Sequence, residues 1–150
     1  MFESILSQYE SPKMLVVINS CKSGSMLHIG NSINGIFMTA CAADELTYDV
    51  ENFQNTVFVE YFVDQGMSQG KADSNEDGHI TAEEAFYYAE SKCNPLPGPI
   101  IIPRTHSQMI DNYEGNLDLS EPVHAPWFTS LPIALLATIV LLIFLRKNRR

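Results

Sequence analysis

The chain has little positive charge. It contains nine Lys and Arg against eighteen Asp and Glu, a formal net charge of −9. Four of the nine bases lie in the last five residues, so the rest of the chain carries five bases against eighteen acids, a net −13. Such a body repels nucleic acid and anionic membrane surfaces, which excludes nucleic-acid partners. A cationic substrate or a metal ion suits it better.

Cysteine is also scarce. The three cysteines, Cys21, Cys41 and Cys93, are an odd number, so no disulfide framework is predicted. Cys41 follows an apolar run, and we expect it to be a small core residue.

A long apolar run occurs only near the C-terminus. Residues 127–145 contain no charge, and these nineteen residues would span about 28 Å as a helix, close to a hydrocarbon core. Trp127 suits one interface, and the basic tail 146–150 suits the cytoplasmic side of a membrane. We expect a transmembrane helix at 127–145 after a stalk at 120–126, with the body outside the cytoplasm. A sortase-type sorting signal is the alternative, although no clear recognition motif precedes the run.

Export of this body would need a signal that the first residues lack. Residues 1–11 (MFESILSQYES) have neither the basic start nor the apolar core of a signal peptide. We therefore expect the true N-terminus to lie upstream of Met1. Insertion of the apolar run after translation is the alternative, and it would leave the body in the cytoplasm.

Cys21 ends a short strand-like segment. The apolar residues 14–18 precede it, as in a central parallel strand, and Ser23, Gly24 and Ser25 follow it. An α/β protein can present a nucleophile in this way, at the end of a strand and before a flexible turn. Gly24 is expected to permit a turn that aims backbone N–H groups at an oxyanion. A buried structural cysteine before an ordinary turn is the alternative.

The segment from Ile18 to Met26 (INSCKSGSM) resembles the nucleophile segment of the caspase/legumain clan of cysteine peptidases. Legumains carry a very similar Cys-any-Ser-Gly-Ser run. Softer similarities extend over 36–45, 82–89 and 107–112, so the resemblance covers roughly residues 5–119. It implies a caspase-like α/β fold and acyl transfer with Cys21 as the catalytic nucleophile.

The catalytic dyad of this clan also needs a histidine, normally in a His-Gly pair before the cysteine. None of the four histidines precedes Cys21 or is followed by Gly; they are His28, His79, His106 and His124. The chain therefore resembles only the C-terminal half of a peptidase domain. We expect it to be inactive alone, with the histidine supplied from outside, for example by a missing N-terminal half in trans.

In this clan, the loop after the second strand lines the pocket for the residue before the scissile bond. By position, Asp44, Glu45 and Thr47, beside Ala42, are the candidate substrate-binding residues. If the acidic side chains point inward, a basic residue before the scissile bond is favoured; a legumain-like preference for Asn is the alternative. An equally good interpretation is that both acids are solvated loop residues.

Residues 73–84 (DSNEDGHITAEE) match the EF-hand calcium loop at every diagnostic position. Gly78 occupies the position of the sharp turn. The expected Ca²⁺ ligands are Asp73, Asn75, Asp77, His79 through its backbone carbonyl, Thr81 through water, and the bidentate Glu84. An acidic helix-capping loop is the alternative. A lone loop lacks the paired partner through which calcium sensors open, so a structural clip is favoured over a switch.

Strand-like and helix-like segments alternate, which predicts an α/β fold. Strands are expected at 14–18 and 36–40, with a loop at 27–35 between them. Helices are expected at 2–9, 52–66 and 81–92, and a connector at 95–103. The predicted architecture is a partial caspase-like sheet flanked by helices over residues 1–119, followed by one C-terminal transmembrane helix.

These features together predict a membrane-anchored cysteine endopeptidase that acts on a peptide or protein substrate and binds Ca²⁺. The alternative function is that of a membrane-anchored, calcium-binding pseudo-peptidase that serves as an interaction module.

Overall fold

The computed structural model describes residues 2–6, 8–9, 11, 13–49, 53, 55–93 and 103–119. All of them belong to one structural unit, Met1–Ser120. The predicted stalk, the apolar segment 127–145 and the basic tail lie outside the described residues. Within the part that is described, no helix is long and apolar enough to cross a membrane.

Three strands form the sheet of the described residues, in the order β1-β2-β3. β1 (Leu15–Ile18) runs parallel to β2 (Ile36–Thr39), and their last residues lie opposite each other. β3 (Gln108–Asp111) is antiparallel to β2, and its first residue lies opposite the last residue of β2. The carboxyl ends of β1 and β2 and the start of β3 therefore share one edge of the sheet.

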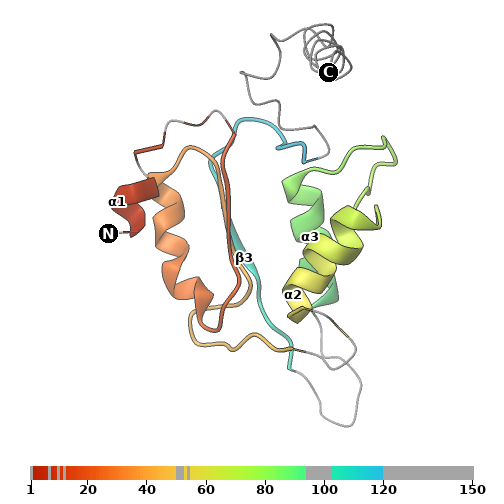
Figure 1. Cartoon of the computed structure of the whole chain (residues 1–150), viewed down its shortest axis with the longest axis horizontal. Coiled ribbons are helices and arrows are strands. Elements are labelled where there is room, and N and C mark those ends of the chain that lie inside the picture. Colours follow the sequence, from red (N-terminus) through yellow and green to blue (C-terminus); the bar gives the residue numbers. More distant parts are fainter. Residues whose placement is uncertain are drawn as a thin grey trace, which may run out of the picture. The chain divides into compact units, whose positions relative to one another are not determined.

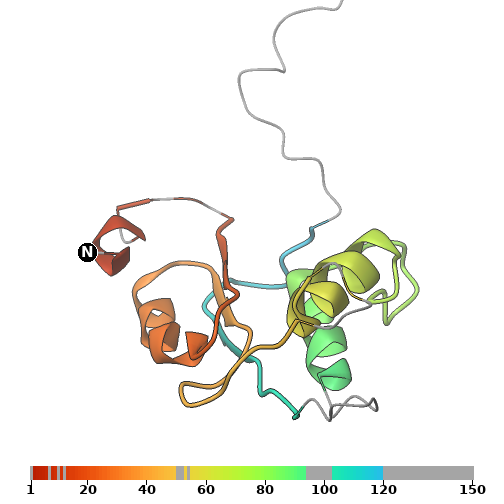
Figure 2. The same ribbon diagram turned by 60° about the horizontal axis from the view of Figure 1, so that its bottom comes forward.

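Helical segments cover both faces of this sheet (Figure 1). One face carries α1 (Phe2–Leu6) and η1 (Ser23–Ser32), a 3-10 helix that connects β1 to β2. The other face carries α2 (Val57–Val59), its π-helical continuation η2 (Glu60–Ser68), and α3 (Ala82–Lys92). Figure 2 shows the same two helical layers from another direction. The expectation of a small α/β sheet flanked by helices is thus confirmed.

The side chains of β2 alternate between two cores, as they do in a strand with both faces buried. Phe37 packs on one face with Ile29 of η1 and with Ile33, the residue that follows η1. Ile36 and Met38 point to the other face, and all three β2 side chains are fully buried. Burial of each such side chain contributes about 1.5–3 kcal/mol to stability. The second core joins β2 to the opposite helical layer through Val57, Phe58, Phe62 and Phe86.

Two threonines start the helices of this second layer. Thr56 caps α2 by accepting the N–H of Val59, and its hydroxyl donates to Asn19 Oδ1 at 2.9 Å. Thr81 caps α3 in a capping box with Glu84, in which each side chain accepts the backbone N–H of the other. The helix predicted at 81–92 is therefore confirmed, with Thr81 as its cap.

The structure corrects three of the expected elements and adds one. Residues 27–35, predicted as a loop, mostly belong to the 3-10 helix η1; its Ser- and Gly-rich sequence has no clear helical periodicity, although Ile29 and Ile33 are buried. The helix predicted at 52–66 begins at Val57 and continues to Ser68. β1, predicted to be central, is an edge strand of the described sheet. β3 is absent from the sequence-based expectations, because its four residues include only two apolar ones.

Candidate functional site

Cys21 lies in a tight turn beyond the carboxyl end of β1. The residue is exposed, and its Sγ donates a hydrogen bond to the backbone carbonyl of Thr47 at 3.7 Å. The next residue, Lys22, has a left-handed backbone with φ 58°, and its N–H donates to the carbonyl of Glu45 at 2.8 Å. This conformation is uncommon for a residue other than glycine and often marks a functional turn. The turn therefore presents the thiol to solvent.

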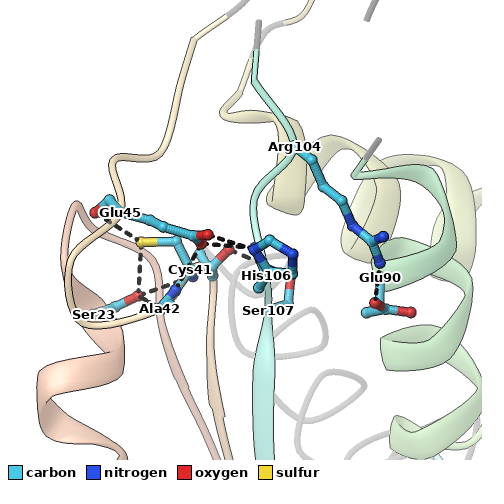
Figure 3. A network of polar contacts seen from close by, with 9 residues as sticks. Ser23, Cys41, Ala42, Glu45, Glu90, Arg104, His106 and Ser107 are labelled. Atoms are coloured by element: carbon cyan, nitrogen blue, oxygen red, sulfur yellow. Dashed lines mark hydrogen bonds and ion pairs between the residues drawn. The ribbon is translucent and has the colours of Figure 1, made fainter. Parts of the chain in front are cut away.

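Ser23 and Cys41 form the buried contact between this turn and the end of β2 (Figure 3). Ser23 is 1% exposed and Cys41 is 0% exposed. Ser23 Oγ accepts the N–H of Cys41 at 3.2 Å and lies 3.6 Å from its sulfur. The Cys41 thiol also contacts the carbonyls of Ser20 and Glu45, each at 3.4 Å. Cys41 is thus a small core residue, as predicted.

Gly24 permits a close approach of three chain segments. A Cβ at this position would lie 2.5 Å from Gln108 Oε1, 2.6 Å from the nitrogen of Ala43 and 2.7 Å from the carbonyl carbon of Ala42. Its N–H donates to the carbonyl of Cys41 at 2.9 Å, and the N–H groups of residues 22, 23 and 25 also donate to carbonyls of the chain. The expectation that Gly24 makes these N–H groups available to an oxyanion is therefore wrong. The glycine is required because its neighbours leave no room for a side chain.

Glu45 is held by groups from two other places in the chain (Figure 3). Its Oε2 accepts the N–H of Ala42 at 3.1 Å and that of His106 at 2.8 Å, and its Oε1 bonds to Nδ1 of the His106 imidazole. Partial burial acts to raise the pKa of the Glu45 carboxyl, but the hydrogen bonds from His106 and Ala42 outweigh it and lower that pKa. Glu45 is therefore an ionised anchor that joins the loop after β2 to the residues before β3.

The predicted substrate-binding residues thus have different surroundings. Thr47 supplies the carbonyl that faces the Cys21 thiol, and Asp44 is exposed on the same loop. The Glu45 carboxylate already accepts three donors, so it is not an open acceptor for a basic substrate residue. Sequence analysis missed the structural partner of Glu45, His106, because these two residues are 61 positions apart and no local pattern connects them.

The three described histidines each have a partner away from the thiol. His28 Nδ1 lies 3.0 Å from the carbonyl of Ser25, and His79 Nδ1 lies 3.0 Å from Asp118 Oδ2. His106 bonds to Glu45. His124 lies outside the described residues. None of these hydrogen bonds joins an imidazole to the Cys21 thiol, whose partner is the carbonyl of Thr47.

Residues 104–107 connect the nucleophile side of the molecule to α3 (Figure 3). Arg104 forms an ion pair with Glu90 of α3 at 3.0 Å, and the N–H of Thr105 donates to the carbonyl of Cys93 at 3.2 Å. Ser107 Oγ donates to the carbonyl of Ala40 at 3.3 Å, at the end of β2. These contacts therefore hold the residues that precede β3 against α3 and against the end of β2.

Side chains of the loop at 73–84 bind the backbone of the same loop. The Asp73 carboxylate accepts the N–H of Asp77 at 3.2 Å and that of Gly78 at 3.0 Å. Asn75 Oδ1 accepts the N–H of Asp77 at 2.9 Å, and Gly78 has φ 83° at the predicted sharp turn. The oxygen-bearing side chains thus hold the loop together, and oxygen is the ligand that Ca²⁺ prefers.

Glu84 has a different role in this arrangement. Its carboxylate accepts the hydroxyl of Ser74 at 2.9 Å and both the N–H and the hydroxyl of Thr81 at 3.1 Å. Partial burial acts to raise the pKa of Glu84, but these hydrogen bonds outweigh it and lower that pKa. Among the residues that the structure describes, no three His, Cys, Asp or Glu side chains are close enough together to hold a metal ion. Glu84 would have to exchange its present bonds to join a metal-binding shell.

Comparison with known families identifies the kind of protein. The model of the peptidase C13 family, the legumain family of the caspase clan, matches residues 1–95, which include Cys21 and the loop 73–84. The chain belongs to the peptidase C13 family. In kind it is therefore a legumain-like cysteine peptidase, as the Cys21 segment indicates. A search of curated proteins finds no match.

Proposed function

We propose that this C13-family chain cleaves peptide bonds through Cys21 when a histidine base is supplied from outside the described residues. The observation that carries the proposal is the exposed Cys21 thiol, in a left-handed turn at the carboxyl edge of two parallel strands. Open α/β sheets place their reactive and binding groups at this edge. The buried contacts of Ser23 and Cys41 hold the turn in place.

The proposed reaction is acyl transfer. The histidine takes the proton of the Cys21 thiol, and the sulfur forms a bond to the carbonyl carbon of the substrate. The histidine then returns the proton to the departing amine as the C–N bond breaks, which leaves a thioester on Cys21. Water then hydrolyses the thioester. The N–H of Cys21 contributes to stabilisation of the oxyanion.

The strand β1 supports docking of a histidine-bearing segment on this sheet. Its four residues are apolar yet only half-buried, and β2 is its one strand neighbour among the described residues. Apolar parallel strands are normally paired and covered, and an open apolar edge is a site for another strand. A parallel strand beside β1 would end near Cys21, at the carboxyl ends of β1 and β2. We therefore propose that an N-terminal half, in cis or in trans, supplies the histidine and that this chain alone is inactive.

The loop after β2 is proposed to bind the substrate residue before the scissile bond. Thr47 lies next to the thiol, and Asp44 is the acid on this loop that is exposed. A preference for a basic residue would therefore depend on Asp44 rather than on Glu45.

A peptide panel tests the peptidase proposal. The full chain, in detergent, would be assayed with fluorogenic peptides that carry Asn, Asp, Lys or Arg before the scissile bond, alone and with a candidate histidine-bearing half. We expect no turnover by the chain alone and turnover with the complete pair that Cys21→Ser abolishes. Turnover by the chain alone that Cys21→Ser abolishes would contradict the missing base but support the nucleophile. Turnover by the complete pair that survives Cys21→Ser would contradict the nucleophile.

We also propose that residues 73–84 bind Ca²⁺ as a structural clip, with Asp73, Asn75, Asp77, the His79 carbonyl, Thr81 and Glu84 as ligands. The oxygen donor set and the turn at Gly78 support this proposal. Calorimetry and thermal unfolding with Ca²⁺, Mg²⁺ or chelator would test it, with Glu84→Gln as the control. We expect a calcium-specific rise in stability that the variant loses. A calcium effect on activity at saturating substrate would instead favour a switch.

The second candidate function is a calcium-binding pseudo-peptidase that acts as an interaction module. This function is favoured because the three described histidines form hydrogen bonds with groups other than Cys21. For either function we propose a single-pass anchor at 127–145, an extracytoplasmic body and a cytoplasmic basic tail. Protease protection of the body in intact cells would test this topology.

A further inference from the structure

The loop at 73–84 pairs with a short segment that lies far from it in sequence. The N–H of Leu119 donates to the carbonyl of Ile80 at 2.8 Å, and the N–H of Ala82 donates to the carbonyl of Leu117 at 2.8 Å. Between these two bonds, Thr81 and Asp118 face each other in an antiparallel bridge. Residues 117–119 therefore pair with the second half of the loop through one antiparallel bridge and its two flanking hydrogen bonds.

Side chains add to this pairing. Both carboxylate oxygens of Glu83, a residue only 9% exposed, lie 3.1 Å from the N–H of Leu117 and accept it. The His79 imidazole lies 3.0 Å from the Asp118 carboxylate. Since Glu83 is not one of the proposed ligands, its buried carboxylate serves to hold residue 117 rather than a metal.

Apolar contacts fasten both ends of the segment. Leu117 is 3% exposed and belongs to the core beneath α3. Leu119 and Ile80 pack against the same core and, with Met67 and Ser68 of η2, line a cavity of about 230 Å³. Residues 117–119 are thus part of the packed core as well as partners of the loop.

We infer that residues 117–119 position the calcium loop, in the place where a second EF-hand loop would otherwise pair with it. They fix the backbone of residues 80–82, which separates the proposed ligand carbonyl of His79 from the proposed ligand Glu84. Fixing these groups before the ion arrives lowers the cost of ordering them on binding. The inference rests on the proposed calcium function and explains how a single loop can work without a paired one.

Thermodynamic reciprocity gives this arrangement a consequence. If the docked segment favours calcium binding, calcium must favour docking of the segment by the same factor. Residue 119 directly precedes the stretch 120–126, which leads to the apolar run 127–145. Calcium therefore fastens the end of the folded body from which the chain continues toward its proposed anchor.

Hydrogen exchange on the full chain in detergent micelles tests the inference. The amides of Leu117 and Leu119 would be followed with Ca²⁺ and with chelator, and calorimetry under the same conditions would measure binding. We expect saturating Ca²⁺ to slow exchange of both amides about tenfold, a typical coupling between linked sites. The amide of Asn112, which donates to the carbonyl of Gly35 at 3.0 Å outside this contact, is the control and should not change.

A variant gives the reciprocal measurement. Leu119→Pro removes the N–H that bonds to Ile80, and we expect it to weaken Ca²⁺ binding about tenfold, whereas Leu119→Ala keeps that N–H and should weaken it less. Calcium binding without protection of the two amides would overturn the inference and leave the calcium proposal intact. If neither binding heat nor protection is seen, both are overturned. If the proline variant does not fold, the exchange experiment on the unaltered chain still tests whether calcium binding and docking of residues 117–119 are coupled.

Discussion

The Cys21 turn and the loop at 73–84 are both polar segments at the margin of the apolar core, but they are stabilised differently. The turn depends on distant partners, since Glu45 beside it binds His106, 61 positions away. The carboxylate of Glu84 in the loop depends on near ones, since it binds Thr81 and Ser74, at most ten positions away, although the second half of the loop also pairs with residues 117–119. Hydrogen bonds lower the pKa of both glutamates. A hydrogen-bonded glutamate carboxylate thus arises from long-range contacts at Glu45 and from local contacts at Glu84.

The largest expected effect comes from Gly24→Ala, which would break the turn and spare the loop. The added Cβ would meet backbone atoms of residues 42 and 43 within 2.7 Å, so we expect a loss of about 3 kcal/mol in the free energy of unfolding. Gly70→Ala is the matched control, because Gly70 has φ 72° but nothing within 4 Å of its added Cβ. It should cost about 1 kcal/mol. Urea denaturation of both variants measures the difference, and equal losses would contradict the close approach at Gly24.

The next effect concerns the long-range anchor. Glu45→Ala removes the acceptor of three hydrogen bonds in a side chain that is 23% exposed. We therefore expect the free energy of unfolding to fall by about 2 kcal/mol, and by less in Glu45→Gln. Because the pKa of Glu45 is lowered from 4.5 in the folded chain, its contribution is complete above that value. It is lost as the pH falls through the folded pKa.

Denaturation at a series of pH values measures this contribution. The difference in the free energy of unfolding between the unaltered chain and Glu45→Gln should be largest near neutral pH and should disappear in acid. A gap that is constant from neutral to acid pH would show that the carboxylate charge is not responsible. The iodoacetamide reaction of Cys21 should also change in Glu45→Ala, since Glu45 and Thr47 lie on the loop that contacts the Cys21 turn.

The smallest effect is expected at the local anchor. Without calcium, Glu84→Ala loses the capping box of α3, which typically contributes about 1 kcal/mol. The pKa of Glu84 is also lowered, so this contribution too disappears as the pH falls through the folded value. In contrast to Glu45→Ala, the reactivity of Cys21 should stay the same. Parallel denaturation and thiol labelling check both points, and a change in Cys21 labelling would mean that the two regions are coupled.

The same contrast explains what the sequence could predict. The turn at Gly78 and the cap at Thr81 were predictable, because the contacts that form them lie within a few residues: Asp73 accepts the N–H of Gly78, and Thr81 and Glu84 cap each other. β1 and β2 were predictable as well, because continuous apolar runs mark buried strands.

The supports of the candidate site were not predictable in the same way. The Cys21 motif indicates the nucleophile, but the pairing of Glu45 with His106 and the clash that requires Gly24 arise only when β3 folds beside β2. β3 itself has too few apolar residues to be recognised. The pairing of residues 117–119 with the loop was missed for the same reason, since three residues carry no periodicity.

The most direct test of the central claim is the labelling of the three cysteines by a peptide-based electrophile, read by mass spectrometry and compared with iodoacetamide. Exposure alone favours Cys21 over the buried Cys41 and Cys93 with either reagent. A formed peptidase subsite should in addition raise the rate of the peptide reagent relative to iodoacetamide at Cys21. We predict this selective gain at Cys21 in the unaltered chain. The same ratio of rates at all three cysteines would contradict a peptidase site and favour the interaction module.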